Sequence, residues 1–117
     1  MLKDSLDMIE ADRQMIADAC ESSPTDKILI THGTDTMVET AHHIANKKPL
    51  LLKQKVIVLM GAMVPHVVHD SDASFNLGFA LGAVSTLNTG IYIAMSGQVF
   101  LWDKVRKNKD KMIFEAG

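Results

Sequence analysis

Three short apolar runs constrain the fold more than any other feature of this 117-residue chain. They span residues 28–31, 56–60 and 91–95, and each is almost continuously apolar, whereas a half-exposed strand would alternate apolar and polar residues. Strands that are buried on both faces of a parallel sheet have this continuous pattern. The three runs therefore predict the central strands of a parallel sheet.

The segments between these runs have the spacing of amphipathic helices. We expect helices over residues 9–21, 36–46 and 72–87, each long enough to connect two parallel strands, and a fourth strand over 99–102 that pairs with the third. The capping-box pattern from Thr36 to Glu39 marks a helix start. The chain is thus predicted to form one α/β domain over residues 1–117, a doubly wound, flavodoxin-like and mostly parallel sheet with flanking helices.

The composition argues against several classes of protein. With 47% hydrophobic and 22% charged residues the chain can form a core, and its net charge of −2 provides no attraction for nucleic acid. No run approaches the roughly 18 apolar residues of a membrane span, and the N-terminus lacks the apolar segment of a signal peptide. The single cysteine, Cys20, permits no intrachain disulfide and fits a cytoplasmic location.

The polar turn over residues 32–37, between a predicted strand and a predicted helix, is the candidate site. Ligands of open α/β sheets bind beyond the carboxyl ends of the strands. Gly33 allows a ligand to approach the backbone, while the Thr34 hydroxyl and the Asp35 carboxylate lie at a helix N-terminus. Threonine and aspartate are also common helix caps, so the residues alone leave a structural and a functional interpretation open.

Four blocks of the sequence, taken together, point to one family. They are Asp4-Ser5-Leu6-Asp7-Met8, His32-Gly33-Thr34-Asp35-Thr36-Met37, Gly61-Ala62-Met63 with Pro65 and the following Ser71-Asp72-Ala73 and Asn76-Leu77, and residues 103–108. In kind, order and spacing they resemble the bacterial-type L-asparaginase/glutaminase family, in its N-terminal domain. The resemblance extends over roughly residues 4–114.

The resemblance implies a catalytic triad of Thr34, Asp35 and Lys107. In it, the lysine amine takes a proton from the threonine hydroxyl or from an activated water, and the carboxylate holds the lysine in place. The amine should then lie within hydrogen-bond reach of Thr34 or Asp35, roughly 2.6 to 3.2 Å. The implied reaction is the hydrolysis of L-asparagine to L-aspartate and ammonia, or of the corresponding glutamine amide, without a cofactor or metal.

The resemblance also implies the residues that bind the substrate. Asp4 and Ser5 belong to the block that holds the α-carboxylate and ammonium groups of the amino acid, with Ser5 bonding the carboxylate. Ala62 would present its backbone to the side-chain amide, and Gly33 and Met63 would line the same site.

The chain departs from the family pattern in several places. It lacks the Thr-Gly-Gly-Thr-Ile segment that carries the primary nucleophile, and it lacks the smaller C-terminal domain. Leu6 and Val64 occupy positions where the family usually has glutamine and arginine. We therefore expect a fragment or late-start form with impaired activity. The alternative is a non-catalytic module that binds an amino acid in the same crevice.

The absence of the first strands leads to an expectation about assembly. The strand at residues 27–31 should become an open edge of the sheet, and open edges invite pairing. The chain is therefore predicted to form a homo-oligomer across this edge or the helix faces beside it. His66 and His69 suggest substrate contact or, more simply, solvent exposure. A metal site is not favoured, because the neighbours His42 and His43 point about 100° apart on a helix and no cysteine lies close in sequence.

Overall fold

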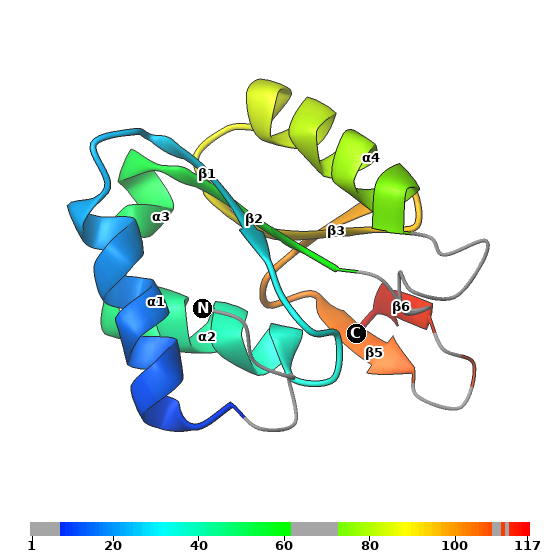
Figure 1. The fold of residues 1–117 in the computed structure, drawn as a ribbon, viewed down its shortest axis with the longest axis horizontal. Helices are drawn as coiled ribbons and strands as arrows, with labels where there is room; N and C mark the ends of the chain where they lie inside the picture. Colours follow the sequence, from blue (N-terminus) through cyan, green and yellow to red (C-terminus); the bar gives the residue numbers. More distant parts are fainter. Residues whose placement is uncertain (1–7, 62–72, 109–110, 112) are drawn as a thin grey trace.

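The computed structural model describes residues 8–61, 73–108, 111 and 113–117. Its main sheet consists of the parallel strands β1 (Lys27–Thr31), β2 (Val56–Met60) and β3 (Gly90–Met95), with β4 (Gln98–Leu101) antiparallel beside β3. The strand order is β1-β2-β3-β4 (Figure 1). The four predicted strands are thus present, each within a residue or so of its expected bounds.

Helices cover both faces of this sheet. The first group contains α1 (Glu10–Ser22), α2 (Met37–Lys47) and the short α3 (Leu51–Gln54), and α4 (Ala73–Thr86) lies on the opposite face (Figure 1). The predicted α/β architecture, a mostly parallel sheet with flanking helices, is confirmed. Helix α2 begins directly after Thr36 as its sequence pattern predicted, but the Thr36 side chain makes no capping hydrogen bond.

Alternation along the central strands divides the core into two clusters. Ile57 and Leu59 of β2 pack towards α1, α2 and α3, whereas Val58 of the same strand packs towards α4. All five residues of β2 are buried, which explains the continuous apolar run. Full burial of one such side chain contributes roughly 1.5 to 3 kcal/mol, so the two clusters dominate the stability of the sheet.

A second, two-stranded sheet was not predicted. It pairs β5 (Val105–Asn108) with β6 (Ile113–Ala116) as an antiparallel hairpin. This segment is rich in lysine and has few apolar residues. Two of them, Val105 and Phe114, are buried in the cluster that also contains residues of α1 and α2. Two side chains anchor the hairpin, and that is too weak a signal to identify strands from the sequence.

Lys55 ties the end of α1 to the start of β2. Its ammonium donates hydrogen bonds to the carbonyl oxygens of Cys20 at 2.5 Å and Ser23 at 2.8 Å, and Lys55 is buried. These are C-terminal carbonyls of a helix, which no intrahelical donor satisfies and which favour a cation. Burial also raises the pKa of the Cys20 thiol to about 11, so this cysteine stays a protonated, apolar part of the core.

We predict that Lys55→Met lowers the free energy of unfolding by about 2 to 3 kcal/mol, because it leaves buried carbonyls without a donor. Urea or thermal unfolding measures the effect. Lys53→Met is the matched control, since Lys53 is exposed two residues away. Equal stability of the two variants would show that the buried ammonium adds nothing to the fold.

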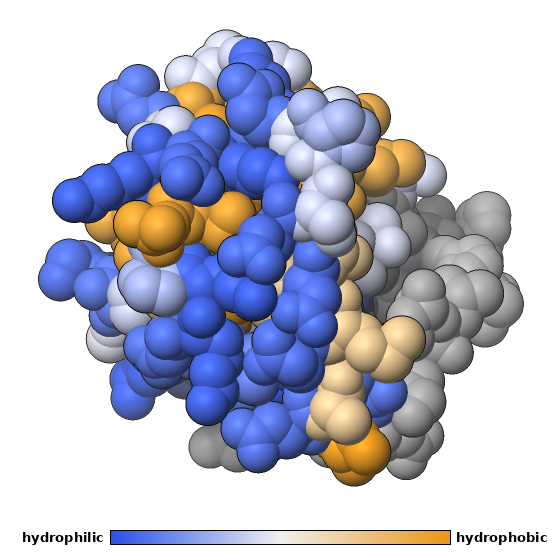
Figure 2. All heavy atoms as spheres, turned by 90° about the vertical axis from the view of Figure 1, so that its left-hand side faces the viewer, coloured by the Kyte–Doolittle hydropathy of each residue, from blue (hydrophilic) through white to orange (hydrophobic). Residues whose placement is uncertain are grey.

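The surface on the α1 side is mostly polar. Figure 2 shows this side as largely hydrophilic, with hydrophobic residues in separate patches. Within the parts of the chain that the structure describes, no helix has both the length and the apolar character needed to cross a membrane.

Candidate active site

The turn between β1 and α2 is held in place by His32. Its backbone N–H donates to the Met60 carbonyl of β2 at 2.8 Å, which continues the sheet by one residue. Its ring bonds the Gly33 carbonyl through Nδ1 at 2.6 Å and the Thr40 hydroxyl through Nε2 at 2.8 Å. Burial lowers the pKa of His32, and a neutral ring with one donor and one acceptor fits these two partners. The ring thereby fixes the backbone that leads to Thr34.

Lys107 of β5 reaches this turn from a distant part of the sequence. Its amine donates to Thr34 Oγ1 at 2.9 Å and to Asp35 Oδ1 at 2.7 Å, across 73 and 72 residues of chain. The lysine side chain is 7% exposed and that of Asp35 is 35% exposed. The three side chains named from the sequence therefore form one partly buried cluster at a helix N-terminus. Their catalytic role stays a prediction.

The carboxyl end of β2 closes onto the same turn at Gly61. A Cβ atom on this glycine would lie 2.2 Å from the His32 carbonyl oxygen, so only glycine permits the observed approach. The Gly61 carbonyl accepts a hydrogen bond from the amide of Asn76 at 2.8 Å, and Asn76 Oδ1 accepts one from Ser96 N–H at 2.9 Å. Asn76 is fully buried, so it links α4 to the ends of β2 and β3. Gly61 and Asn76 both belong to the third sequence block that resembles the family, but the sequence did not predict the contacts that they make.

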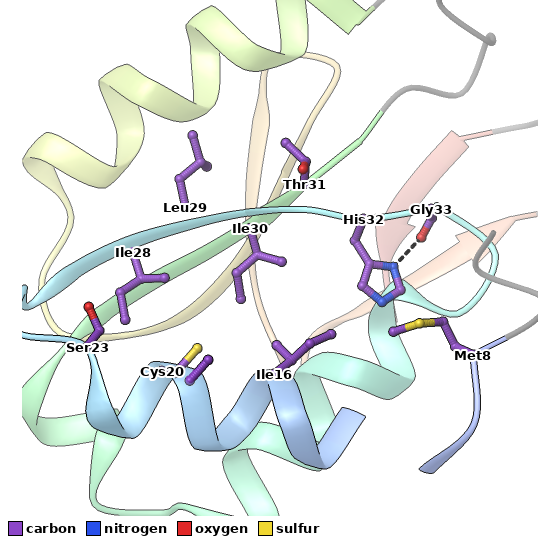
Figure 3. A pocket seen from close by; sticks show the side chains of 11 residues that line it. Met8, Ile16, Cys20, Ser23, Ile28, Leu29, Ile30, Thr31, His32 and Gly33 are labelled. Carbon is purple, nitrogen blue, oxygen red and sulfur yellow. Dashed lines mark hydrogen bonds between the residues drawn. The ribbon is translucent and has the colours of Figure 1, made fainter. Parts of the chain in front are cut away.

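A groove of about 360 Å³ runs between α1 and β1 and ends at Gly33, the glycine predicted to line the substrate site. Ile28 and Ile30 point into it towards α1 (Figure 3). Successive residues of a strand direct their backbone N–H and C=O groups to opposite neighbouring strands. Since the N–H of His32 bonds to β2, the N–H and C=O groups of Leu29 and Thr31 point away from β2. Among the described strands β1 lies at the edge of the sheet. That this edge is open stays a prediction.

Several predicted positions fall outside the described residues. Asp4, Ser5, Ala62 and Met63, named for substrate binding, are among them, as are His66 and His69. In the described ranges, no group of three or more histidine, cysteine, aspartate or glutamate residues is arranged to hold a metal ion.

The arrangement has definite chemical capacities. A lysine amine beside a hydroxyl can receive its proton when the amine is neutral, and a carboxylate beside the same amine can hold it in position. The backbone N–H groups at the start of α2 favour negative charge nearby. The fold and the cluster together define a doubly wound α/β protein with a threonine, aspartate and lysine site beyond the carboxyl end of an edge strand.

Comparisons with known proteins agree with this description. The family model described as asparaginase, N-terminal, matches residues 1–113. The glutaminase-asparaginase of Acinetobacter glutaminasificans is 31% identical over 97 residues, which cover 80% of this chain and 28% of that protein. The solved L-asparaginase of Thermococcus kodakarensis superposes with a TM-score of 0.84 at 28% identity, covering 99% of this chain and 36% of that one.

The chain therefore belongs to the asparaginase family and corresponds to its N-terminal domain. L-asparaginase 2 of Escherichia coli K12 is 38% identical over 79 residues, or 64% of this chain and 22% of that protein. The chain thus spans only about a quarter of the length of these curated relatives.

Proposed function

We propose that this chain provides a catalytic triad for a cytoplasmic amide hydrolase that acts on asparagine or glutamine and releases ammonia. The observation that carries the proposal is the position of the Lys107 amine, within 2.9 Å of the Thr34 hydroxyl and 2.7 Å of the Asp35 carboxylate. Residues far apart in sequence meet here at short range, at the end of the sheet where α/β proteins bind ligands.

Each residue has a distinct part in the proposed reaction. Neutral Lys107 accepts the proton of the Thr34 hydroxyl, or of a water beside it, as the oxygen attacks the amide carbon. Asp35 holds the resulting ammonium as an ion pair, across the 2.7 Å contact between its carboxylate and the amine. The lysine then returns the proton to the leaving nitrogen and ammonia departs. If a water attacked, the product is the free acid; if the Thr34 hydroxyl attacked, the product is an ester of Thr34, which a second water cleaves, with Lys107 passing a proton of that water to the threonine oxygen.

The relatives support both side-chain amides as substrates. The protein of Acinetobacter glutaminasificans is named a glutaminase-asparaginase, whereas that of Escherichia coli K12 is named an L-asparaginase. The proposal therefore names the substrate class, a small amino acid with a terminal amide, rather than one of its two members.

The second candidate function is amino-acid binding without chemistry. It is favoured by the burial of the lysine, because a lysine side chain that is 7% exposed and paired with a carboxylate is also the geometry of a structural ion pair. In that case Thr34 and Asp35 would only shape the crevice.

Ammonia release by the purified chain separates the two functions. We expect slow but measurable release from asparagine or glutamine, below about 1 per second, that Thr34→Val abolishes while the circular dichroism spectrum stays unchanged. Valine has the shape of threonine without the hydroxyl. Amide chemical shifts that move on addition of asparagine, with ammonia release equal in the chain and in Thr34→Val, would instead support the binding module.

A further inference from the structure

Arg13 has a buried donor without a partner. Its Nε atom is buried and meets no hydrogen-bond acceptor within the part of the chain that the structure describes. A charged donor is costly to bury unpaired, and each such group in a folded protein requires an explanation. The same state is found at Oε1 of Glu115, but the second oxygen of that carboxylate accepts a bond from Arg106 at 3.4 Å. The Arg13 guanidinium therefore favours a ligand that brings an acceptor.

The position of Arg13 on α1 directs it towards the candidate active site. Arg13 lies one turn before Ile16 and two turns before Cys20, so the three side chains share one face of the helix. Ile16 and Cys20 line the groove between α1 and β1. Of these two, Ile16 lies nearer to His32 and Gly33 (Figure 3). Arg13, one turn further in the same direction, is thus at the end of the groove where Gly33 lies.

The charge of Arg13 is felt at the turn that leads to Thr34. Burial lowers the pKa of the His32 ring, and the nearby positive charge of Arg13 lowers this pKa further. The same ring bonds the Gly33 carbonyl at 2.6 Å. The guanidinium, the imidazole and the glycine therefore lie close together at the end of the groove, directly before Thr34 in the chain.

An arginine in this place suits a carboxylate. The guanidinium carries its donors in a planar fork that can bond both oxygens of a carboxylate at once. The side-chain amide of asparagine or glutamine is neutral, so the α-carboxylate is the group of this substrate class with the matching charge. Asp35, which is 35% exposed, gives the same site a negative group for the α-ammonium. A cation and a carboxylate near Gly33 are what a zwitterionic ligand requires.

We propose that Arg13 binds the carboxylate of an amino-acid ligand beside Gly33 and thereby selects ligands that have a free carboxylate. The inference rests on the proposed function in its choice of an amino acid as the ligand, and on no chemistry of the Thr34 cluster. The family resemblance assigned the carboxylate to Ser5 and did not point to Arg13. Because Arg13 takes part in binding, its loss should raise KM and leave kcat largely unchanged.

The test follows the Nε–H signal of Arg13 by nuclear magnetic resonance while ligands are added to the whole chain. Arg13 and Arg106 are the arginines of the sequence, so the variant Arg13→Gln assigns the signal. The ligands are L-asparagine, L-asparaginol, in which an alcohol replaces the carboxylate, and acetate, which is a carboxylate alone. We expect asparagine and, at higher concentration, acetate to shift the signal, and asparaginol to leave it in place.

Affinities for the same ligands test the selectivity. Arg13→Gln should weaken the binding of asparagine about 10- to 100-fold, the usual effect of losing a hydrogen bond to a charged group. The binding of asparaginol should stay nearly unchanged, whereas a variant that is merely less well folded would lose affinity for both. Lys47→Gln is the control, because it removes the same charge at the exposed far end of α2 and should change neither affinity.

The possible failures can be told apart. If asparagine shifts the backbone amide signals of Gly33 and Thr34 while the Arg13 signal stays in place, the role of Arg13 is overturned and the proposed function stands. If acetate moves the Arg13 signal and asparagine does not, the carboxylate site is supported and the proposed function is contradicted instead. An Arg13 signal that neither ligand moves, or an equal loss of affinity for asparagine and asparaginol in Arg13→Gln, would overturn the inference.

Discussion

Replacing Lys107 by methionine should lower the rate of ammonia release by roughly 10² to 10⁴-fold, the usual contribution of a positioned general base. Methionine keeps the unbranched apolar stem of lysine, without its terminal amine, and cannot accept or donate the proton. The ion pair with Asp35 and the bond to Thr34 are lost together. Any polypeptide that contains this chain and releases ammonia from asparagine or glutamine is suitable for the measurement.

Lys107 and Asp35 should act as one catalytic unit when activity is lost. Asp35→Ala should cause a comparable decrease, and combining it with Lys107→Met should add little, because residues that act together are not additive. Lys104→Met is the control, since Lys104 is exposed just before the same strand.

Chemical rescue distinguishes a missing amine from a damaged fold. Lys107→Cys should be inactive, and alkylation of that cysteine with bromoethylamine, which restores an amine of similar reach, should return part of the activity. The native Cys20 is buried with a raised pKa and should react slowly. Undiminished turnover in Lys107→Met would remove the lysine from the mechanism.

Replacing Gly61 by alanine should strongly destabilise the fold. The new Cβ atom would lie 2.2 Å from the His32 carbonyl oxygen, which is backbone and cannot rotate away. The ends of β1 and β2 would have to separate, breaking the bond from His32 N–H to the Met60 carbonyl. We expect a loss of about 3 kcal/mol, the upper end of the range for overpacking, or roughly 12 °C in melting temperature for a domain of this size.

The same addition elsewhere should act in the opposite direction. Gly82 lies within α4, and a Cβ atom there meets nothing within 4 Å. Gly82→Ala should therefore raise stability by about 0.5 to 1 kcal/mol through the helix propensity of alanine. Thermal unfolding compares the stabilities of Gly61→Ala and Gly82→Ala. The protein is kept dilute so that association between chains does not affect the melting temperatures. A melting temperature for Gly61→Ala within about 2 °C of the unaltered chain, well under 1 kcal/mol, would mean that the strand ends are free to move.

Much of the main sheet could be predicted because its signals are local. The residues of β2 are apolar at every position since both faces are covered, and a polar residue at either face would leave a buried group unpaired. The turn at Thr34 and Asp35 was also visible, because a helix that follows a buried strand needs polar residues at its start. The orientation of α4 could not be predicted. Its helical spacing predicted the helix, but because the helix carries no charged residue, the sequence did not indicate which of its faces packs on the sheet.

The sequence by itself determined the order of the four strands of the main sheet and of the three long helices, and it placed Thr34 and Asp35 at the end of an apolar strand. These features depend on contacts within about a dozen residues of chain and on the periodic burial of side chains. The family resemblance named Lys107 as their partner, and only the tertiary structure shows how the lysine reaches them. Its position depends on a polar hairpin that was not predicted, held by Val105 and Phe114 in a core built from distant helices. A contact across 72 residues follows from how these layers pack, and no local pattern records it.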